Sequence, residues 1–138
     1  MKGLIHVYNA IDDEKISIFP YKIPFDVPAI TLEIGGDYGI FVDYDRINSL
    51  YDEFMILSHE YGHCTTGTTH PIGCDIYTKS KHEYKANRKS VTTFLPVEKI
   101  IEAFSAGCVM SYEVAEYLDL PEKFVIMAFE HYKAMEKL

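Results

Sequence analysis

The chain has 138 residues, enough for one domain with a substantial core, and 48% of them are hydrophobic, including eleven Tyr and eight Phe, which excludes a disordered chain. The net charge of −8 argues against non-specific binding to nucleic acid or to an anionic membrane. No apolar run approaches the roughly 20 residues that cross a bilayer, and the first nine residues lack the pattern of a signal peptide.

The first part of the chain predicts one helix and a small sheet. Residues 3–11 place apolar side chains on one helical face. Residues 16–19 are rich in β-branched and aromatic side chains, which is typical of a strand. Two further strand-like runs, residues 29–34 and 38–43, flank the turn signal Gly35-Gly36-Asp37. We therefore expect a short antiparallel sheet of about three strands.

A longer helix should follow this sheet. Ser49, with Asp52 three residues later, offers a helix start, and Gly67 lies just past the expected end. Apolar side chains recur between them at spacings of three or four, as on a buried helix face: Leu50, Phe54, Leu57 and Tyr61.

This helix carries the pattern H-E-x-x-H. Residues four apart share a helix face, so His59 and His63 can bind one metal ion. Glu60 adjoins them, and its carboxylate can take a proton from water at a zinc ion. Chance occurrence on an ordinary helix is the alternative. The apolar residues 54–57 argue against it, because they bury the helix and carry polar side chains inward, where these need partners.

The rest of the chain is expected to be a loop followed by helices. Residues 64–80 contain Thr, Gly and Pro without a clear period, which predicts a loop beside the metal site. Residues 81–88 open a second helix that ends before Pro96. The tail predicts three helices: residues 97–106 closed by Gly107, residues 111–118 capped by Ser111, and a last one opened by Pro121.

The last two of these helices follow one another as in a helix-turn-helix motif. Residues 97–138 carry eight acidic and four basic side chains, however, which favours helical packing over contact with DNA. We expect no direct binding to nucleic acid and no membrane association.

Spacing alone leaves the third metal ligand open among His70, His82 and Glu83. His70 follows the motif as in a longer zinc-binding pattern, but one residue late. Glu83 lies on the second helix with Asn87 one turn later, where an amide can orient a ligand. For Glu83, the alternative is an exposed carboxylate that pairs with a lysine.

The cysteines indicate a reducing compartment. There are three of them, Cys64, Cys74 and Cys108, without C-x-x-C spacing, which predicts free thiols and a cytoplasmic protein. Cys64 follows His63 directly, but a helix turns about 100° per residue, so its thiol should point away from the metal.

Several of these segments together resemble the ImmA/IrrE family of metallopeptidases from phages and mobile elements. The family pairs an H-E-x-G-H helix with a downstream E-x-x-A-N-like helix that ends near Leu-Pro, and the similarity runs from about residue 38 to the end. The matching segments are residues 59–63, 81–87, 94–96 and 111–118.

The resemblance implies a zinc ion held by His59, His63 and Glu83, with Glu60 as general base and Asn87 as a residue that orients a ligand. It implies a single, small α+β zincin-like domain over residues 1–138, with residues 1–48 forming a helix and the sheet, 49–96 the metal-site helices and 97–138 a helical tail.

The implied function is a zinc metallo-endopeptidase of a phage or mobile element. Its implied substrate is an XRE-type helix-turn-helix repressor, which it would cleave. The alternative is a regulatory binding protein with a structural metal that holds a repressor or toxin partner. Residues 79–89 carry five basic side chains against one acidic, which could dock an acidic partner, although such a run is more often a solvated helix face.

Overall fold

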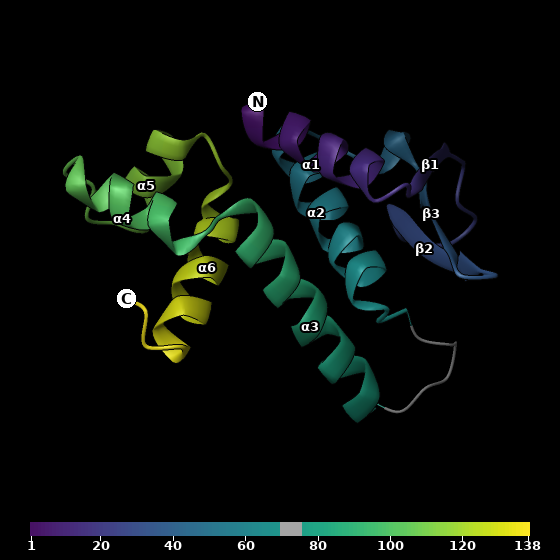
Figure 1. The fold of residues 1–138 in the computed structure, drawn as a ribbon. Helices are drawn as coiled ribbons and strands as arrows, with labels where there is room; N and C mark the ends of the chain where they lie inside the picture. Colours follow the sequence, from purple (N-terminus) through teal and green to yellow (C-terminus); the bar gives the residue numbers. More distant parts are fainter. Residues whose placement is uncertain (70–75) are drawn as a thin grey trace.

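The computed structural model describes residues 1–69 and 76–138 and has an α+β fold that is mostly helical (Figure 1). Over these residues the elements follow the chain in this order: α1 (Lys2–Asp13), β1 (Ser17–Pro20), β2 (Ala29–Ile34), β3 (Asp37–Val42), a 3-10 turn η1 (Tyr44–Arg46), α2 (Leu50–Thr66), α3 (Ile76–Phe94), α4 (Val97–Ser105), α5 (Ser111–Leu118) and α6 (Glu122–Ala134).

The three strands form a mixed sheet with the order β1-β3-β2, so the expectation of a wholly antiparallel sheet is wrong. β2 pairs antiparallel with β3, but β1 pairs parallel with β3. The cause is the proline-containing connection from β1 to β2, residues 21–28, which passes across the end of β3 instead of making a tight hairpin. Its backbone is held there by hydrogen bonds from Tyr21 N to Val42 O (2.9 Å) and from Asp43 N to Pro28 O (2.9 Å).

The predicted hairpin between β2 and β3 is confirmed. Ile34 pairs with Asp37 across a two-residue turn, and Gly35 and Gly36 both adopt positive φ values, 62° and 89°. Two-residue hairpin turns of this kind require positive φ at both central positions, which glycine adopts without a steric penalty.

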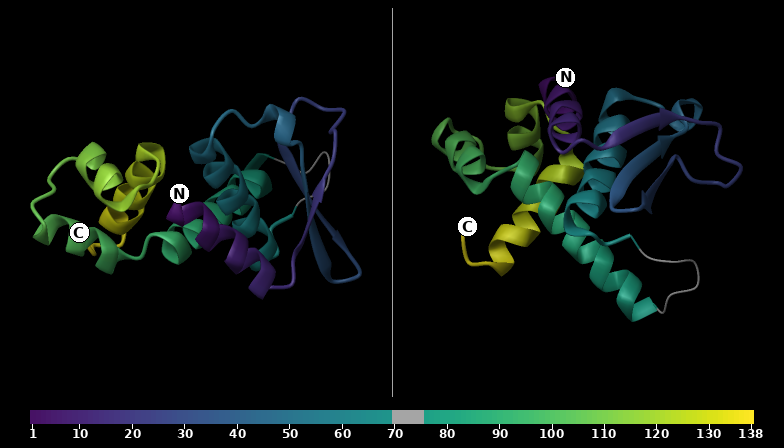
Figure 2. Two further views of the ribbon diagram at one scale, coloured as in Figure 1. Left: turned by 90° about the horizontal axis from the view of Figure 1, so that it is seen from above. Right: turned by 45° about the vertical axis from the view of Figure 1, so that its right-hand side comes forward.

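One core joins the helices to the inner face of the sheet. α1, α2 and α3 contact one another, and α2 also contacts β2. Phe54 of α2 lies at the centre and meets Phe94 of α3 and Phe124 of α6 edge-on, with ring centroids 6.2 and 4.9 Å apart. The sheet therefore lies at one end of the molecule and α4–α6 at the other, with α2 and α3 between them (Figures 1 and 2).

The loop predicted over residues 64–80 is too long at both ends. α2 continues through Thr66, in agreement with the helix end predicted from Gly67, and α3 already begins at Ile76, while residues 70–75 lie outside the described part of the chain. The side chains of the first turn of α3 are mostly exposed and give no apolar period, so the predicted start at residue 81 is too late.

The helical tail is confirmed, with one change at a helix start. Ser111 is the first helical residue of α5 and not its cap; instead, Glu113 accepts hydrogen bonds from the backbone N–H groups of Met110 (2.9 Å) and Val109 (3.3 Å). The tail is tied to the residue that follows α3, because the Tyr132 hydroxyl of α6 donates to Leu95 O (2.8 Å). No helix in the described residues is long and apolar enough to cross a membrane.

Candidate metal centre

Helix α2 carries both histidines and the intervening acid of the motif, and its two ends are fixed as predicted. The Ser49 side chain accepts a hydrogen bond from Asp52 N at the helix start (3.1 Å). Gly67 ends the helix in the left-handed conformation (φ 62°), which favours glycine. This turn folds the chain back, so that Thr68 N donates to His63 O (3.1 Å) and Thr68 lies beside the second histidine.

The third group, Glu83, comes from α3, and a close helix crossing brings it to α2. At the crossing, a Cβ added to Gly62 would lie only 2.2 Å from the backbone oxygen of Ala86. Ala86 itself is fully buried. Only glycine at position 62 lets the two backbones approach this closely, which places one turn of α2 directly against the turn of α3 that carries Glu83.

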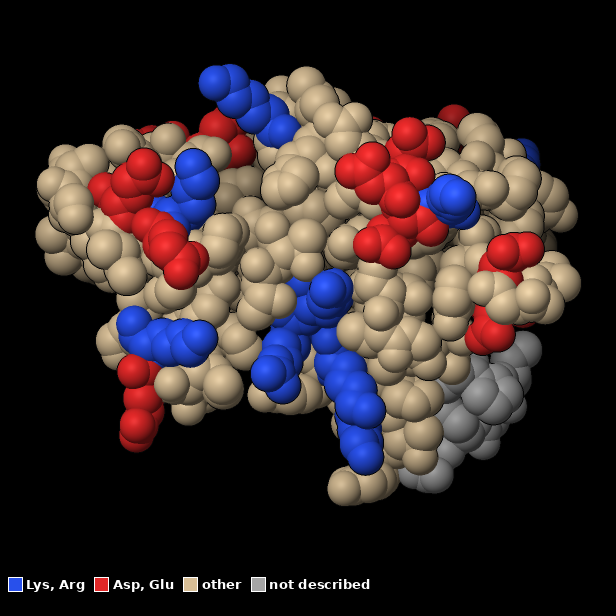
Figure 3. All heavy atoms as spheres, in the orientation of Figure 1, with Lys and Arg blue, Asp and Glu red and all other residues tan. Residues whose placement is uncertain are grey.

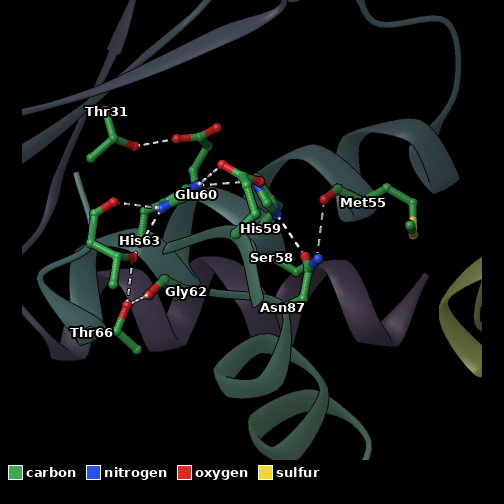
Figure 4. A network of polar contacts seen from close by, with 11 residues as sticks. Thr31, Met55, Ser58, His59, Glu60, Gly62, His63, Thr66 and Asn87 are labelled. Atoms are coloured by element: carbon green, nitrogen blue, oxygen red, sulfur yellow. Dashed lines mark hydrogen bonds and ion pairs between the residues drawn. The ribbon is translucent and has the colours of Figure 1, made fainter. Parts of the chain in front are cut away.

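His59, His63 and Glu83 converge on one point between the two helices. Figure 4 shows the two histidines on α2 with Glu60 and Asn87 around them. The two Nε2 atoms are 3.1 Å apart. Glu83 Oε2 lies 2.9 Å from the Nε2 of His59, and Glu83 Oε1 lies 3.0 Å from the Nε2 of His63. Among the described residues, these three form the cluster of potential metal ligands, so the assignment of Glu83 as the third member is supported by geometry.

The Nδ1 atoms of both histidines, on the side of each ring away from the cluster, contact hydrogen-bond acceptors. His59 Nδ1 lies 2.9 Å from Asn87 Oδ1. His63 Nδ1 lies 3.2 Å from the backbone oxygen of Thr68 and 3.0 Å from its hydroxyl. Because a carbonyl oxygen can only accept, both Nδ1 atoms carry the hydrogen in these contacts. Each Nε2 atom then presents a lone pair to the centre.

This donor set fits a divalent metal ion. Two Nε2 lone pairs and a carboxylate meet within about 3 Å of one another, and all three are acceptors, so they need a positive charge between them. Their separations are close to the roughly 3.3 Å between neighbouring ligands of a tetrahedral zinc ion. Burial and the neighbouring His59 also lower the pKa of His63, which favours the neutral imidazole that binds metals.

Glu60 lies beside the cluster but is held by a different element. The hydroxyl of Thr31, on β2, donates a hydrogen bond to Glu60 Oε2. Burial raises the pKa of Glu60, while the bond from Thr31 and the proximity of His59 oppose that rise. Glu60 is therefore a carboxylate with reduced hydration and a fixed orientation, as a general base requires.

A cleft of about 340 Å³ opens over these groups. One wall is the chain from Val27 to Thr31, and the floor is formed by the motif residues and Glu83. β2 lies at the edge of the sheet, and no other strand of the described chain pairs with its outer side. The cleft thus places a strand edge next to the metal ligands.

The other candidates from the sequence lie elsewhere. His82 does not belong to the cluster, and His70 lies outside the described residues. Cys64 is buried and absent from the cluster, as its helical position predicted, and burial raises the pKa of its thiol to about 12. Cys108 is a free thiol, whereas Cys74 falls in the part that is not described.

The sequence did not identify Thr31 and Thr68 as parts of the site. Both act through tertiary contacts with side chains of α2, and neither belongs to a recognisable spacing. The position of Thr68, next to the helix-ending Gly67, is the one local signal that could have pointed to it.

Comparison of the chain with protein-family models, with curated proteins and with solved structures finds no match. The assignment of the metal site therefore rests on the sequence motif and on the geometry described above.

Proposed function

We propose that this chain is a zinc-dependent endopeptidase of the ImmA/IrrE type, with zincin-like packing of its sheet on α2. The observation that carries the proposal is the convergence of His59, His63 and Glu83 with Glu60 beside them in an open cleft. A structural zinc site has four protein ligands and is closed, whereas a catalytic site has three and leaves a position open for water. Three ligands in an accessible cleft fit the catalytic kind.

Zinc is the ion that this ligand set favours. Two imidazole nitrogens and one carboxylate form a common catalytic zinc combination, whereas magnesium and calcium prefer oxygen ligands throughout. When bound, zinc supplies Lewis acidity that polarises the scissile carbonyl and activates water.

Residues of the chain would transfer the proton and hold the reacting groups in place. Glu60 accepts the proton of the attacking water and delivers it to the leaving amine nitrogen. Thr31 holds the Glu60 carboxylate toward the cleft, and the acceptors on Asn87 and Thr68 keep both imidazoles in the tautomer that faces the centre.

The edge of β2 would hold the substrate. A peptide in extended conformation can add to a free strand edge through backbone hydrogen bonds, and β2 forms the wall of the cleft next to Glu60. We propose a helix-turn-helix repressor of a phage or mobile element as the substrate, a choice that rests on the motif resemblance alone.

Cleavage of a co-produced repressor tests this function. The chain is produced together with candidate helix-turn-helix repressors from the same genome, and the fragments are identified by mass spectrometry. We expect cleavage by the wild type, while Glu60→Gln should keep its zinc and lose activity by about 10²–10⁴-fold, because the general base is removed. Glu53→Gln, on the same helix but away from the cleft, serves as the matched control.

Full activity of Glu60→Gln would refute the proposed role of this residue. A stable complex of the repressor with the wild type, without fragments and unchanged by Glu60→Gln, would support a regulatory binding protein instead.

A further inference from the structure

A second concavity lies on a face of α3 next to the one that carries the metal centre, and Asn87 borders both. It is a groove of about 240 Å³ between α3 and α6. Tyr84 and Val91 of α3 and Met127 and Ala134 of α6 give it mostly apolar walls. Of the residues assigned a role at the metal centre, Asn87 alone is among those that line this groove. Its Oδ1 atom contacts Nδ1 of His59.

The α3 wall of this groove carries a repeated pattern. Tyr77 and Tyr84 are seven residues apart, and each is followed four residues later by a cation, Lys81 and Arg88. Spacings of four and seven place all four side chains on one face of the helix. The two rings are 76% and 59% exposed, so this face has no cover within the described chain.

The cations on this face, Lys81 and Arg88, and the exposed Lys85 beside them are available to a partner. Within residues 1–69 and 76–138, no carboxylate lies within ion-pair distance of Lys81, Lys85 or Arg88. In Figure 3 a group of basic side chains lies over α3 in the lower middle of the face shown, and the acidic side chains of this face lie above it and to either side. The chain as a whole carries a charge of −8, so this positive face stands out against an acidic surface.

Arg88 is the one Lys or Arg side chain among the described residues that line the groove. His131, on the α6 wall, has its pKa lowered by burial and further by the positive charges of Arg88 and Lys137. Among the described residues that line the groove, Glu130 is the one carboxylate. Lys81 and Lys85 lie on α3 outside this lining, so the positive charge belongs to the exposed face of α3 beside the groove.

We propose that the groove between α3 and α6 docks an acidic amphipathic helix of a partner protein. Its apolar face would lie on Tyr84 and Met127, and its carboxylates would meet Arg88, Lys81 and Lys85. A ligand helix matches the seven-residue repeat of α3, because helices that pack side by side along a groove meet at this spacing. The charge of the rim selects an acidic helix over a basic one.

This docking does not depend on catalysis, and its test is made without cleavage. The full chain with Glu60→Gln is labelled with ¹⁵N and titrated with a synthetic 18-residue peptide designed as an amphipathic helix with Leu on one face and Glu on its flanks. A matched peptide carries Lys in place of every Glu. We expect the acidic peptide to bind at least about tenfold more tightly, more weakly as salt rises, and to shift the signals of Tyr84, Arg88 and Met127.

Charge reversals in the protein give the controls. Arg88→Glu and, separately, Lys85→Glu should each weaken binding by about fivefold, Glu130→Lys should strengthen it, and Lys22→Glu, a reversal on the exposed connection between β1 and β2, should leave it unchanged. The amide spectrum of each variant reports whether the fold is kept.

Equal binding of the two peptides, shifts that map away from the groove, or equal effects of Arg88→Glu and Lys22→Glu would overturn the proposal. A dimer in sedimentation that dissociates in Arg88→Glu, without peptide binding, would assign the groove to a second copy of the chain and would also overturn it.

Discussion

Helix α3 has two faces that differ in how their side chains are held. The face toward α2 carries Glu83 and Asn87, whose polar atoms meet fixed partners at 2.9–3.0 Å. The face toward solvent carries Tyr84 and Lys85, which are exposed. One helix thus combines a site that needs fixed geometry with a surface whose side chains are free to adapt to a partner.

The difference arises from backbone packing. Gly62 allows α2 to touch the backbone of α3 at Ala86, so the inner face of α3 has little freedom to move. On the outer face, α6 diverges from α3 and leaves the groove (Figure 1). Substitutions on the inner face should therefore change stability and metal binding, and those on the outer face should not.

The largest effect is expected for Gly62→Ala. Alanine is normally the better helix former by about 1 kcal/mol, but here its methyl group would meet the backbone oxygen of Ala86. We expect a loss of about 3 kcal/mol in the free energy of unfolding, measured by urea denaturation, and reduced zinc content. Ala86→Gly should not rescue it, because the clash is with the backbone. A gain in stability would show that the two helices do not cross so closely.

Asn87→Ala should have an intermediate effect. It removes the acceptor that orients His59, and loss of such an outer contact typically weakens metal binding by about 10–100-fold. Competition with a chromophoric zinc chelator measures the affinity. Asn87→Asp keeps an oxygen acceptor and should retain most of the affinity; equal losses in both variants would contradict the orienting role.

The smallest effect is expected on the outer face. Lys85→Ala removes an exposed charge with no ion-pair partner among the described residues, so stability should change by less than about 0.5 kcal/mol and zinc affinity should not change. The same denaturation and chelator measurements apply. A clear loss of zinc here would mean that the two faces are not independent.

The sequence predicted those parts of the site that depend on helical spacing. The four-residue step from His59 to His63, the cap at Ser49 and the end at Gly67 are local features, and all three appear as expected. Glu83 could not be chosen over His82 by spacing, because the choice depends on how α3 crosses α2. The contact between Gly62 and Ala86 decides that crossing.

The parts that could not be predicted depend on contacts between distant segments. The parallel pairing of β1 with β3 follows from the path of the connection before β2, which no strand pattern encodes. Thr31 meets Glu60 only because β2 lies over α2. The apolar pattern does not predict the early start of α3, because the first turn is mostly exposed and contributes little to any apolar period.

The most direct test of the metal centre is the zinc content of the purified chain, measured by elemental mass spectrometry on wild type and Glu83→Ala prepared without added metal. We predict about one zinc per wild-type chain and a clear loss in the variant, because Glu83 supplies the third ligand. Zinc retained at the wild-type level without Glu83, or no zinc in the wild type even after it is offered, would contradict the assignment of this site.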